Sequence, residues 1–155
     1  MNTPITPDLT FFASADIRVD PALEFGQVGA GVRRMVPITG GLIQGVDWQG
    51  VILPGGMDYQ LIIEGRRAQL EARYTIETDA GDLVYVRNRG VRSGTPEALG
   101  RLLRGERVLP GEVYSCGSPT FETSSPSLGW IADRIFISQG RRLPDRLELT
   151  FFQVG

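Results

Sequence analysis

Residues 68–77, Ala-Gln-Leu-Glu-Ala-Arg-Tyr-Thr-Ile-Glu, alternate apolar and polar side chains at every position. Because successive side chains of a β-strand point to opposite faces, this period of two predicts a strand with one buried face. The same pattern occurs at residues 9–19, where only Phe12 breaks it, and again at residues 147–151. Three long alternating strands predict an antiparallel sheet.

Shorter β-rich segments surround these three strands. Residues 78–82 have the composition of a turn, so residues 68–87 are expected to form a hairpin. Further strands are expected at residues 32–38, 48–53, 59–63, 113–116 and 131–138, each bounded by Gly, Pro or Ser. About nine strands at these spacings are typical of a barrel or a sandwich.

One short helix is predicted near the middle of the chain. Thr95 can cap it, Pro96 suits its first position, and Gly105 follows as a terminator. We expect this helix to lie across an opening or edge of the barrel. No domain boundary or repeat interrupts the sequence, so residues 1–155 are expected to form a single domain.

Composition excludes several kinds of chemistry. The 155 residues include no His and one Cys, which removes Cys/His zinc sites and Ser-His or Cys-His nucleophile pairs. All 16 basic residues are Arg, so lysine Schiff-base chemistry is excluded as well. We expect no cofactor and no transition metal, while a loose Mg²⁺ or Ca²⁺ site formed by Asp58 and Glu122 remains open.

Charge and hydropathy limit the kinds of binding partner that can be expected. The net charge is -2, and the arginine pairs are interleaved with acids, so nucleic acid is not an expected partner. No run approaches the roughly 18 apolar residues that span a bilayer, and no membrane contact is expected. The N-terminal segment lacks the features of a signal peptide, which predicts a cytoplasmic protein.

Glycine-rich residues 26–31 and 40–45 match no phosphate-binding template and are expected at turns and barrel corners.

Charged and aromatic side chains inside the predicted strands are the candidates for function. A charge that faces a barrel lumen must be paired or hydrogen-bonded, because an isolated buried charge is very costly. For Glu71 and Arg73, cross-strand ion pairs on an exposed face are an equally good interpretation. Tyr74, Tyr114 and Trp130 could cover a flat ligand at a barrel mouth, although core packing is the commoner use of such rings. Cys116 has no basic neighbour to activate it and is expected to be an inert thiol.

Several ordered motifs together resemble one protein family. They are residues 31–41 (GVRRMVPITGG), 51–60 (VILPGGMDYQ), 71–78 (EARYTIET), 85–92 (YVRNRGVR) and 121–123 (FET), followed by Trp130. This set resembles the DUF3237 family, also called UPF0311, over nearly the whole chain. The resemblance implies a compact β-barrel found mainly in bacteria and fungi, without an established activity. The expected fold is therefore all-β, a single antiparallel barrel of about nine or ten strands with one short helix.

The resemblance also marks candidate site residues. They are Arg34, Thr39, Asp58, Gln60, Arg73, Tyr74, Glu122 and Trp130. Two segments depart from the family pattern, since relatives usually carry Tyr-Phe-Arg at residues 114–116 and Trp-Leu-Asn at residues 130–132. The arginine and asparagine missing here would be polar wall groups, which predicts a smaller, less basic or differently selective pocket.

Two functions from different classes follow. The first is a small-molecule pocket for an anionic aromatic or alicyclic metabolite, in which Arg34, Thr39, Gln60, Arg73 and Trp130 bind the ligand. If the protein is an enzyme, the chemistry is cofactor-free proton transfer, isomerisation or lyase chemistry, with Asp58 or Glu122 as the base and Tyr74 as the donor. The second is an interaction protein that acts through a homo-oligomer or an exposed strand edge.

Overall fold

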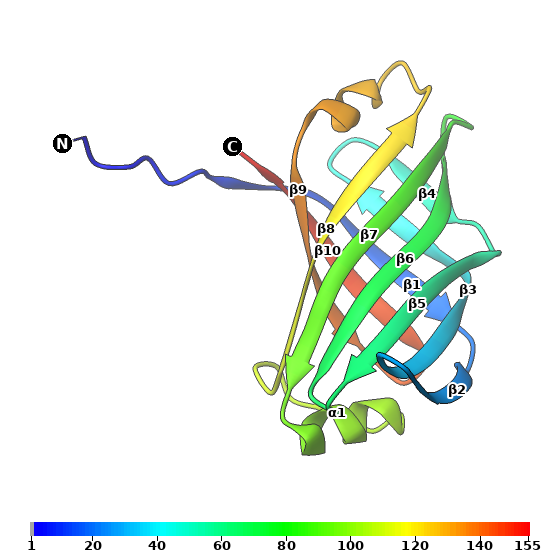
Figure 1. The fold of residues 1–155 in the computed structure, drawn as a ribbon. Helices are drawn as coiled ribbons and strands as arrows, with labels where there is room; N and C mark the ends of the chain where they lie inside the picture. The colour runs from blue at the N-terminus through cyan, green and yellow to red at the C-terminus, as the bar shows by residue number, and fades with distance from the viewer. Residues whose placement is uncertain (1) are drawn as a thin grey trace.

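The computed structural model describes residues 2–155, which contain ten β-strands, one α-helix and one 3-10 helix. The strands are β1 (Leu9–Val19), β2 (Leu23–Val28), β3 (Gly31–Gly45), β4 (Gln49–Ile52), β5 (Gly56–Ile63), β6 (Arg67–Thr78), β7 (Leu83–Gly94), β8 (Val113–Thr123), β9 (Phe136–Arg142) and β10 (Arg146–Val154). The helices are α1 (Pro96–Leu103) and the 3-10 helix η1 (Gly129–Asp133). Figure 1 shows the strands wrapped into a barrel, from which the N-terminal segment extends.

The strands close on themselves in an antiparallel circuit. Neighbours pair in the order β1, β3, β5, β6, β7, β8, β9, β10, and β10 pairs back to β1. The two remaining strands extend this circuit, since β4 also lies between β3 and β6, and β2 pairs with β3. The predicted all-β antiparallel barrel with one short helix is thereby confirmed. Closure leaves few free edges, which is the usual way in which barrels avoid edge pairing.

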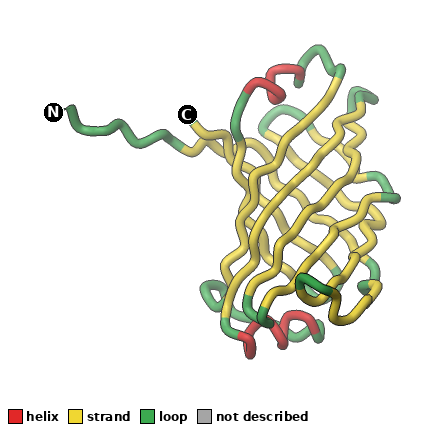
Figure 2. The backbone as a smooth tube through the Cα atoms, viewed as in Figure 1, coloured by secondary structure: helices red, strands yellow, loops and turns green. Residues whose placement is uncertain are grey.

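The two helices lie at opposite ends of the barrel, α1 at the lower end and η1 at the upper end of Figure 2. Helix α1 begins as expected, because the Thr95 hydroxyl accepts a hydrogen bond from the Ala98 amide at 3.1 Å and Pro96 follows the cap. Its buried residues are Ala98, Leu99 and Leu102. The helix therefore covers the lower opening with one apolar face.

Aromatic side chains fill the barrel toward η1. Phe12 lies with its ring centroid 4.9 Å from that of Phe136, and Phe121 lies 5.2 Å from Phe136. Phe12 can turn inward together with Ala13 because the pairing of β1 with β10 shifts register between Phe11 and Ala13. The residue that broke the alternation in the sequence therefore marks a β-bulge.

Residues 40–45, expected at a turn or a barrel corner, include glycines that permit a close contact between strands. Gly41 has a φ of 150°, and a Cβ atom at this position would collide with the carbonyl oxygen of Asp16 on β1. This segment lies inside β3 at the point where the strand changes partners. Any larger residue at position 41 would separate β1 from β3.

Three details of the expected strand pattern were wrong. Residues 131–138 do not form one strand, because η1 occupies Gly129–Asp133 and places Ile131 in the core with 2% exposure. The predicted strand at residues 113–116 continues to Thr123. Strand β2 was missed because all six of its residues are exposed, so no burial on one face imposes an alternating pattern.

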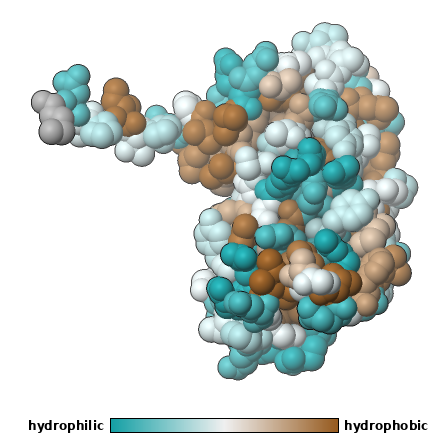
Figure 3. Space-filling view, viewed as in Figure 1, coloured by the Kyte–Doolittle hydropathy of each residue, from teal (hydrophilic) through white to brown (hydrophobic). Residues whose placement is uncertain are grey.

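The outer surface mixes polar and apolar side chains. Figure 3 shows a largely polar face with apolar patches, one of them where the N-terminal segment meets the barrel. None of the helices within residues 2–155 has the length and apolar character needed to cross a membrane.

Candidate functional site

The barrel interior becomes polar toward the α1 end. There the inward positions carry polar side chains, among them Asp58, Gln60, Asn88, Arg92 and Ser138, all at least 92% buried. They line a cavity of about 50 Å³ whose other walls include Val36, Ala72, Gly90, Gly117 and Gly140. Small residues leave this space open, since a Cβ atom at position 117 would collide with the Asn88 side chain.

Strand alternation decides which candidates reach this cavity. On β5 the inward residues are Asp58 and Gln60, and on β6 they include Tyr74. Cross-strand pairing sets Asp58 beside Ala72, so Tyr74 is the next inward residue along β6. Asp58, Gln60 and Tyr74 therefore line one cavity.

A chain of hydrogen bonds fixes the Asp58 carboxyl group. Arg34 Nε donates to Glu24 Oε1 at 2.7 Å, and Arg34 Nη1 donates to Gln60 Oε1 at 2.9 Å. Gln60 Nε2 then donates to Asp58 Oδ2 at 2.8 Å. Arg34 thus acts on the site through Gln60, and one oxygen of the Asp58 carboxyl is held in place.

Two buried polar atoms at the cavity lack a partner among residues 2–155. They are Oδ1 of Asp58 and the hydroxyl oxygen of Tyr74. Burial raises the pKa of the Asp58 carboxyl, an effect that the Gln60 hydrogen bond and the nearby charges of Arg92, Arg142 and Arg34 oppose only in part. Burial, and then the Asp58 charge, raises the pKa of the Tyr74 hydroxyl. Tyr74 is therefore a neutral donor at all physiological pH values.

Arg92 on β7 is a buried charge inside the barrel. Its residue is 3% exposed, and within residues 2–155 its guanidinium makes no hydrogen bond or ion pair. Burial lowers the pKa of Arg92 to about 10, while the Asp58 charge acts in the opposite direction. A buried charge without a bonded partner is costly unless something else compensates it.

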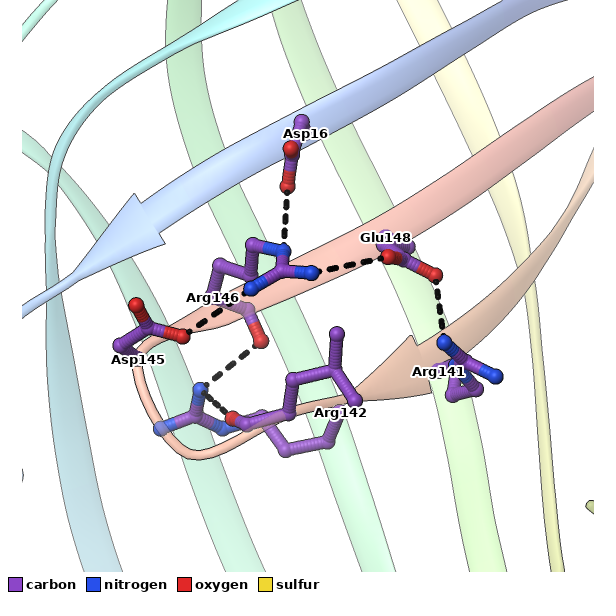
Figure 4. Close-up of polar contacts among 7 residues, drawn as sticks. Asp16, Arg141, Arg142, Asp145, Arg146 and Glu148 are labelled. Atoms are coloured by element: carbon purple, nitrogen blue, oxygen red, sulfur yellow. Dashed lines mark hydrogen bonds and ion pairs between the residues drawn. The ribbon is translucent and has the colours of Figure 1, made fainter.

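A second inward arginine lies at the same end. Arg142 of β9 donates from Nη1 to the carbonyl oxygens of Leu143 at 2.6 Å and Arg146 at 3.1 Å, as Figure 4 shows. Burial lowers the pKa of Arg142, and the Arg34 charge adds to that effect. Arg92 and Arg142 therefore line the cavity with the single carboxyl of Asp58, which gives the cavity an excess of positive charge, while Arg34 is paired with Glu24.

The other predicted site residues lie away from this cavity. Thr39 is exposed, and Arg73 lies on the outer face of β6, where it donates to Glu71 at 3.1 Å. Glu122 is exposed on the outer face of β8, so it does not lie beside Asp58 and the two cannot share a cation. Trp130 lies in η1 at the opposite end, with its ring edge-on to Phe12 at 5.7 Å.

Glu71 belongs to an ion-pair cluster on the barrel exterior. Its Oε1 accepts from Arg87 Nε at 2.6 Å and from Arg73 Nη2 at 3.1 Å, with Arg89 Nε at 3.4 Å. The Arg87 hydrogen bond is the main reason why the pKa of Glu71 is lowered to about 2. Glu71 thus forms cross-strand ion pairs with Arg87 and Arg89 of β7 on an exposed face, while its pair with Arg73 runs along β6.

Arg92, Arg142, Asn88 and Ser138 were not singled out from the sequence. A usable signal existed for two of them, since Asn88 and Arg92 share the even-numbered positions of β7 with the buried residues Val84 and Val86. Asn88 of β7 and Ser138 of β9 are joined over the intervening strand β8 by hydrogen bonds of 3.0 and 3.3 Å. No sequence spacing reveals that contact, because 50 residues separate the two.

Comparisons with known proteins agree with this fold. The family model described as "Protein of unknown function (DUF3237)" matches residues 7–154. A UPF0311 protein of Rhodopseudomonas palustris is 40% identical over 137 residues, which cover 88% of this chain and 90% of the relative. A crystal structure of a conserved protein of unknown function from the same species has a TM-score of 0.94 at 38% identity, with 99% of this chain and all of that chain covered.

A β-barrel-like protein from Acinetobacter baumannii has a TM-score of 0.85 at 32% identity, and each chain is covered completely. These matches extend over almost every strand of the barrel, including those that carry Asp58 and Arg92. The chain therefore belongs to the DUF3237 family, whose members are also named UPF0311 proteins.

Proposed function

We propose that this protein binds a small anionic molecule whose charged head occupies the interior cavity toward the α1 end of the barrel and pairs with Arg92. The observation that carries the proposal is the Arg92 guanidinium, 3% exposed and without a bonded partner within residues 2–155. A carboxylate, phenolate or enolate would satisfy it in the bidentate geometry that arginine favours. The unpartnered Asp58 Oδ1 and Tyr74 hydroxyl would hydrogen-bond a hydroxyl or carbonyl group of the same head.

Cavity size limits what can enter. The interior space of about 50 Å³ holds a group of a few atoms. A cavity of about 150 Å³ is needed to hold benzene. The aromatic or alicyclic body of the molecule would consequently lie outside the cavity, with only its polar head inside.

The same groups are suited to proton transfer. Asp58 with a raised pKa is a base for an acidic C–H proton, and Tyr74 is a neutral donor to the carbonyl oxygen of the molecule. The positive charge of Arg92 would stabilise the enolate that forms. The protein would thus act on its ligand as a cofactor-free proton-transfer catalyst.

Binding is tested with benzoate, 4-hydroxybenzoate and cyclohexanecarboxylate, with neutral benzyl alcohol as the uncharged comparison. Isothermal titration is expected to show carboxylate binding to the wild type that weakens at least tenfold in Arg92→Met. The matched control is Arg89→Met on the same strand, where the side chain is 65% exposed and points outward. Carboxylate affinities that are equal in Arg92→Met and the wild type would overturn the proposal.

Proton transfer is tested with 2-tetralone, a ring ketone with acidic α-protons. In D₂O, nuclear magnetic resonance is expected to show faster α-proton exchange with the wild type than with buffer. Asp58→Asn should remove the acceleration. Acceleration that survives in Asp58→Asn would assign the exchange to another group.

A second candidate, an interaction protein, has one specific observation in its favour. Strand β2 pairs with β3 alone within residues 2–155, and its Leu23 and Phe25 are 53% and 57% exposed. A free edge with exposed apolar side chains is a common surface for self-association. Light scattering should then show an oligomer that Phe25→Glu dissociates and that Leu83→Glu, at a position also 53% exposed, leaves intact. A monomeric wild type would remove this candidate.

A further inference from the structure

The barrel wall is incomplete between β8 and β9. These strands pair only at Cys116 with Gln139 and Gly117 with Ser138. By contrast, β8 remains paired with β7 as far as Val113, and β9 remains paired with β10 as far as Arg142. Residues 113–115 and 140–142 therefore face each other without strand pairing, and we call this gap the β8–β9 seam.

A groove lies over this seam on the outside of the barrel. Its volume is about 610 Å³, within the range of roughly 300–1,000 Å³ that is typical of small-molecule sites. Leu102 of α1, the segment 108–110, Val113 and Tyr114 give it apolar and aromatic walls. Leu109 and Tyr114 are 63% and 59% exposed, so this apolar surface is open to solvent.

The groove meets the interior cavity at the seam. Five residues line both spaces: Arg92, Ser115, Cys116, Gly140 and Arg142. At the seam, a Cβ atom at position 140 would lie 3.0 Å from Leu149 Cδ2 and 3.2 Å from Ser115 Oγ, so rotatable side chains and not paired strands separate the groove from the cavity that Arg92 lines. The charges on the groove wall are Arg92, Arg141, Arg142 and the carboxylate of Glu148, which is paired with Arg141 at 3.3 Å. The groove therefore retains a positive excess.

We infer that the β8–β9 seam is the entrance to the site and that the groove over it holds the ring of the ligand. This inference rests on the proposed function. The ring would lie against Leu109 and Tyr114, and the anionic head would pass between Ser115 and Gly140 to reach Arg92. The ligand class is then a ring carboxylate or phenolate larger than the interior cavity, with its charge at one end.

A reversible staple across the seam tests the entrance. A Cβ atom at position 140 would lie 3.2 Å from the Ser115 Oγ atom, so cysteines at these two positions are close enough to form a disulfide. The variant Ser115→Cys/Gly140→Cys is made together with Cys116→Ser, which prevents pairing with the native thiol. The single variant Cys116→Ser is its control.

The probe is 6-hydroxy-2-naphthoate, a fluorescent ring carboxylate, followed by stopped-flow fluorescence. The oxidised staple is expected to lower the association rate at least tenfold, and dithiothreitol should restore the rate of the Cys116→Ser control. An oxidised staple that binds at the control rate would overturn the seam as entrance. If Arg92→Met nevertheless abolishes binding, the proposed function stands and only the route is wrong.

A second pair of variants tests the groove without a disulfide. Leu109→Glu adds a negative charge to the groove wall and is expected to weaken naphthoate binding at least tenfold. Leu83→Glu adds the same charge at an exposed position outside the groove and should bind as the wild type does. Equal affinities for the two variants would overturn the placement of the ring. Absence of naphthoate binding to the wild type, with loss of the benzoate series as well, would instead overturn the proposed function itself.

Discussion

Asp58 on β5 and Arg92 on β7 share the barrel interior, both more than 90% buried, yet no ion pair within 4.0 Å joins them. Their charges still influence each other, because the Arg92 charge favours ionised Asp58 and the Asp58 charge favours ionised Arg92. Two opposite charges held apart across a cavity form a site that a polar ligand can bridge.

Asp58→Asn should change how stability depends on pH. Burial raises the pKa of Asp58 in the folded protein above its usual 3.8. Below pH 3.8 the carboxyl is protonated in both the folded and the unfolded protein, so its ionisation costs the folded state no stability there. The stability of the wild type should then fall, relative to Asp58→Asn, as pH rises from about 3.8 through the raised pKa. Melting temperatures measured from pH 3 to pH 8 should diverge by at least about 2 °C, the shift that about 1 kcal/mol produces in a domain of this size. Parallel curves for the two proteins would contradict a raised pKa.

Arg92→Met should stabilise the protein. A buried polar group without a hydrogen-bond partner costs about 1–3 kcal/mol, and a charged group costs more, so an apolar side chain of similar length should recover part of that cost. Urea unfolding of Arg92→Met should therefore show a higher midpoint than that of the wild type, while Arg89→Met should lie within about 1 kcal/mol of it. Stability that is lost together with binding would point to a structural role for Arg92. Stability gained while binding is lost is the expected result for a binding residue.

Tyr74→Phe should also stabilise the fold, since it removes a hydroxyl that is buried without a partner. An unsatisfied buried polar group costs about 1–3 kcal/mol, and about 1 kcal/mol should be recovered in urea unfolding. Tyr85→Phe, at a position 38% exposed on β7, should have almost no effect. A Tyr74→Phe variant less stable than the wild type would show that water or another group satisfies the hydroxyl.

Glu71→Gln should lower the stability of the folded protein at neutral pH but not in strong acid. The lowered pKa of folded Glu71, about 2, means that its ion pairs stabilise the protein above the unfolded value of 4.5. That contribution is lost as pH falls from 4.5 through about 2. The side chain is 28% exposed, so about 1 kcal/mol is expected at pH 7, decreasing with added salt. Thermal unfolding at pH 7 and pH 2 checks both limits.

Thr95→Ala should destabilise the protein by about 1 kcal/mol, because the Ala98 amide then loses its capping acceptor. Thr95→Ser keeps a hydroxyl and should retain most of the stability. Urea unfolding compares the three proteins. An equal loss in both variants would mean that the methyl group of Thr95, rather than its hydroxyl, stabilises the start of α1.

Much of the barrel could be predicted from local patterns. The alternation of residues 68–77 groups Tyr74 with the apolar residues, and the structure places Tyr74 inward and Arg73 outward, whereas the expected pocket had included both. Extending the same parity along β7 would have placed Arg92 inside with Val84 and Val86. Strand β2 could not be predicted in this way, because a strand exposed on both faces has no apolar period.

The sequence by itself determined that the fold is all-β and where the helix and its cap lie. It also excluded imidazole and lysine chemistry. These properties depend on residue type and on spacing within one segment. Only the tertiary structure decided that Arg92 and Arg142 share one space with Asp58, that Glu122 lies outside, and that β8 and β9 are unpaired between Val113 and Ser115. Those relationships depend on how distant strands are paired and where the barrel closes, which no local alternation specifies.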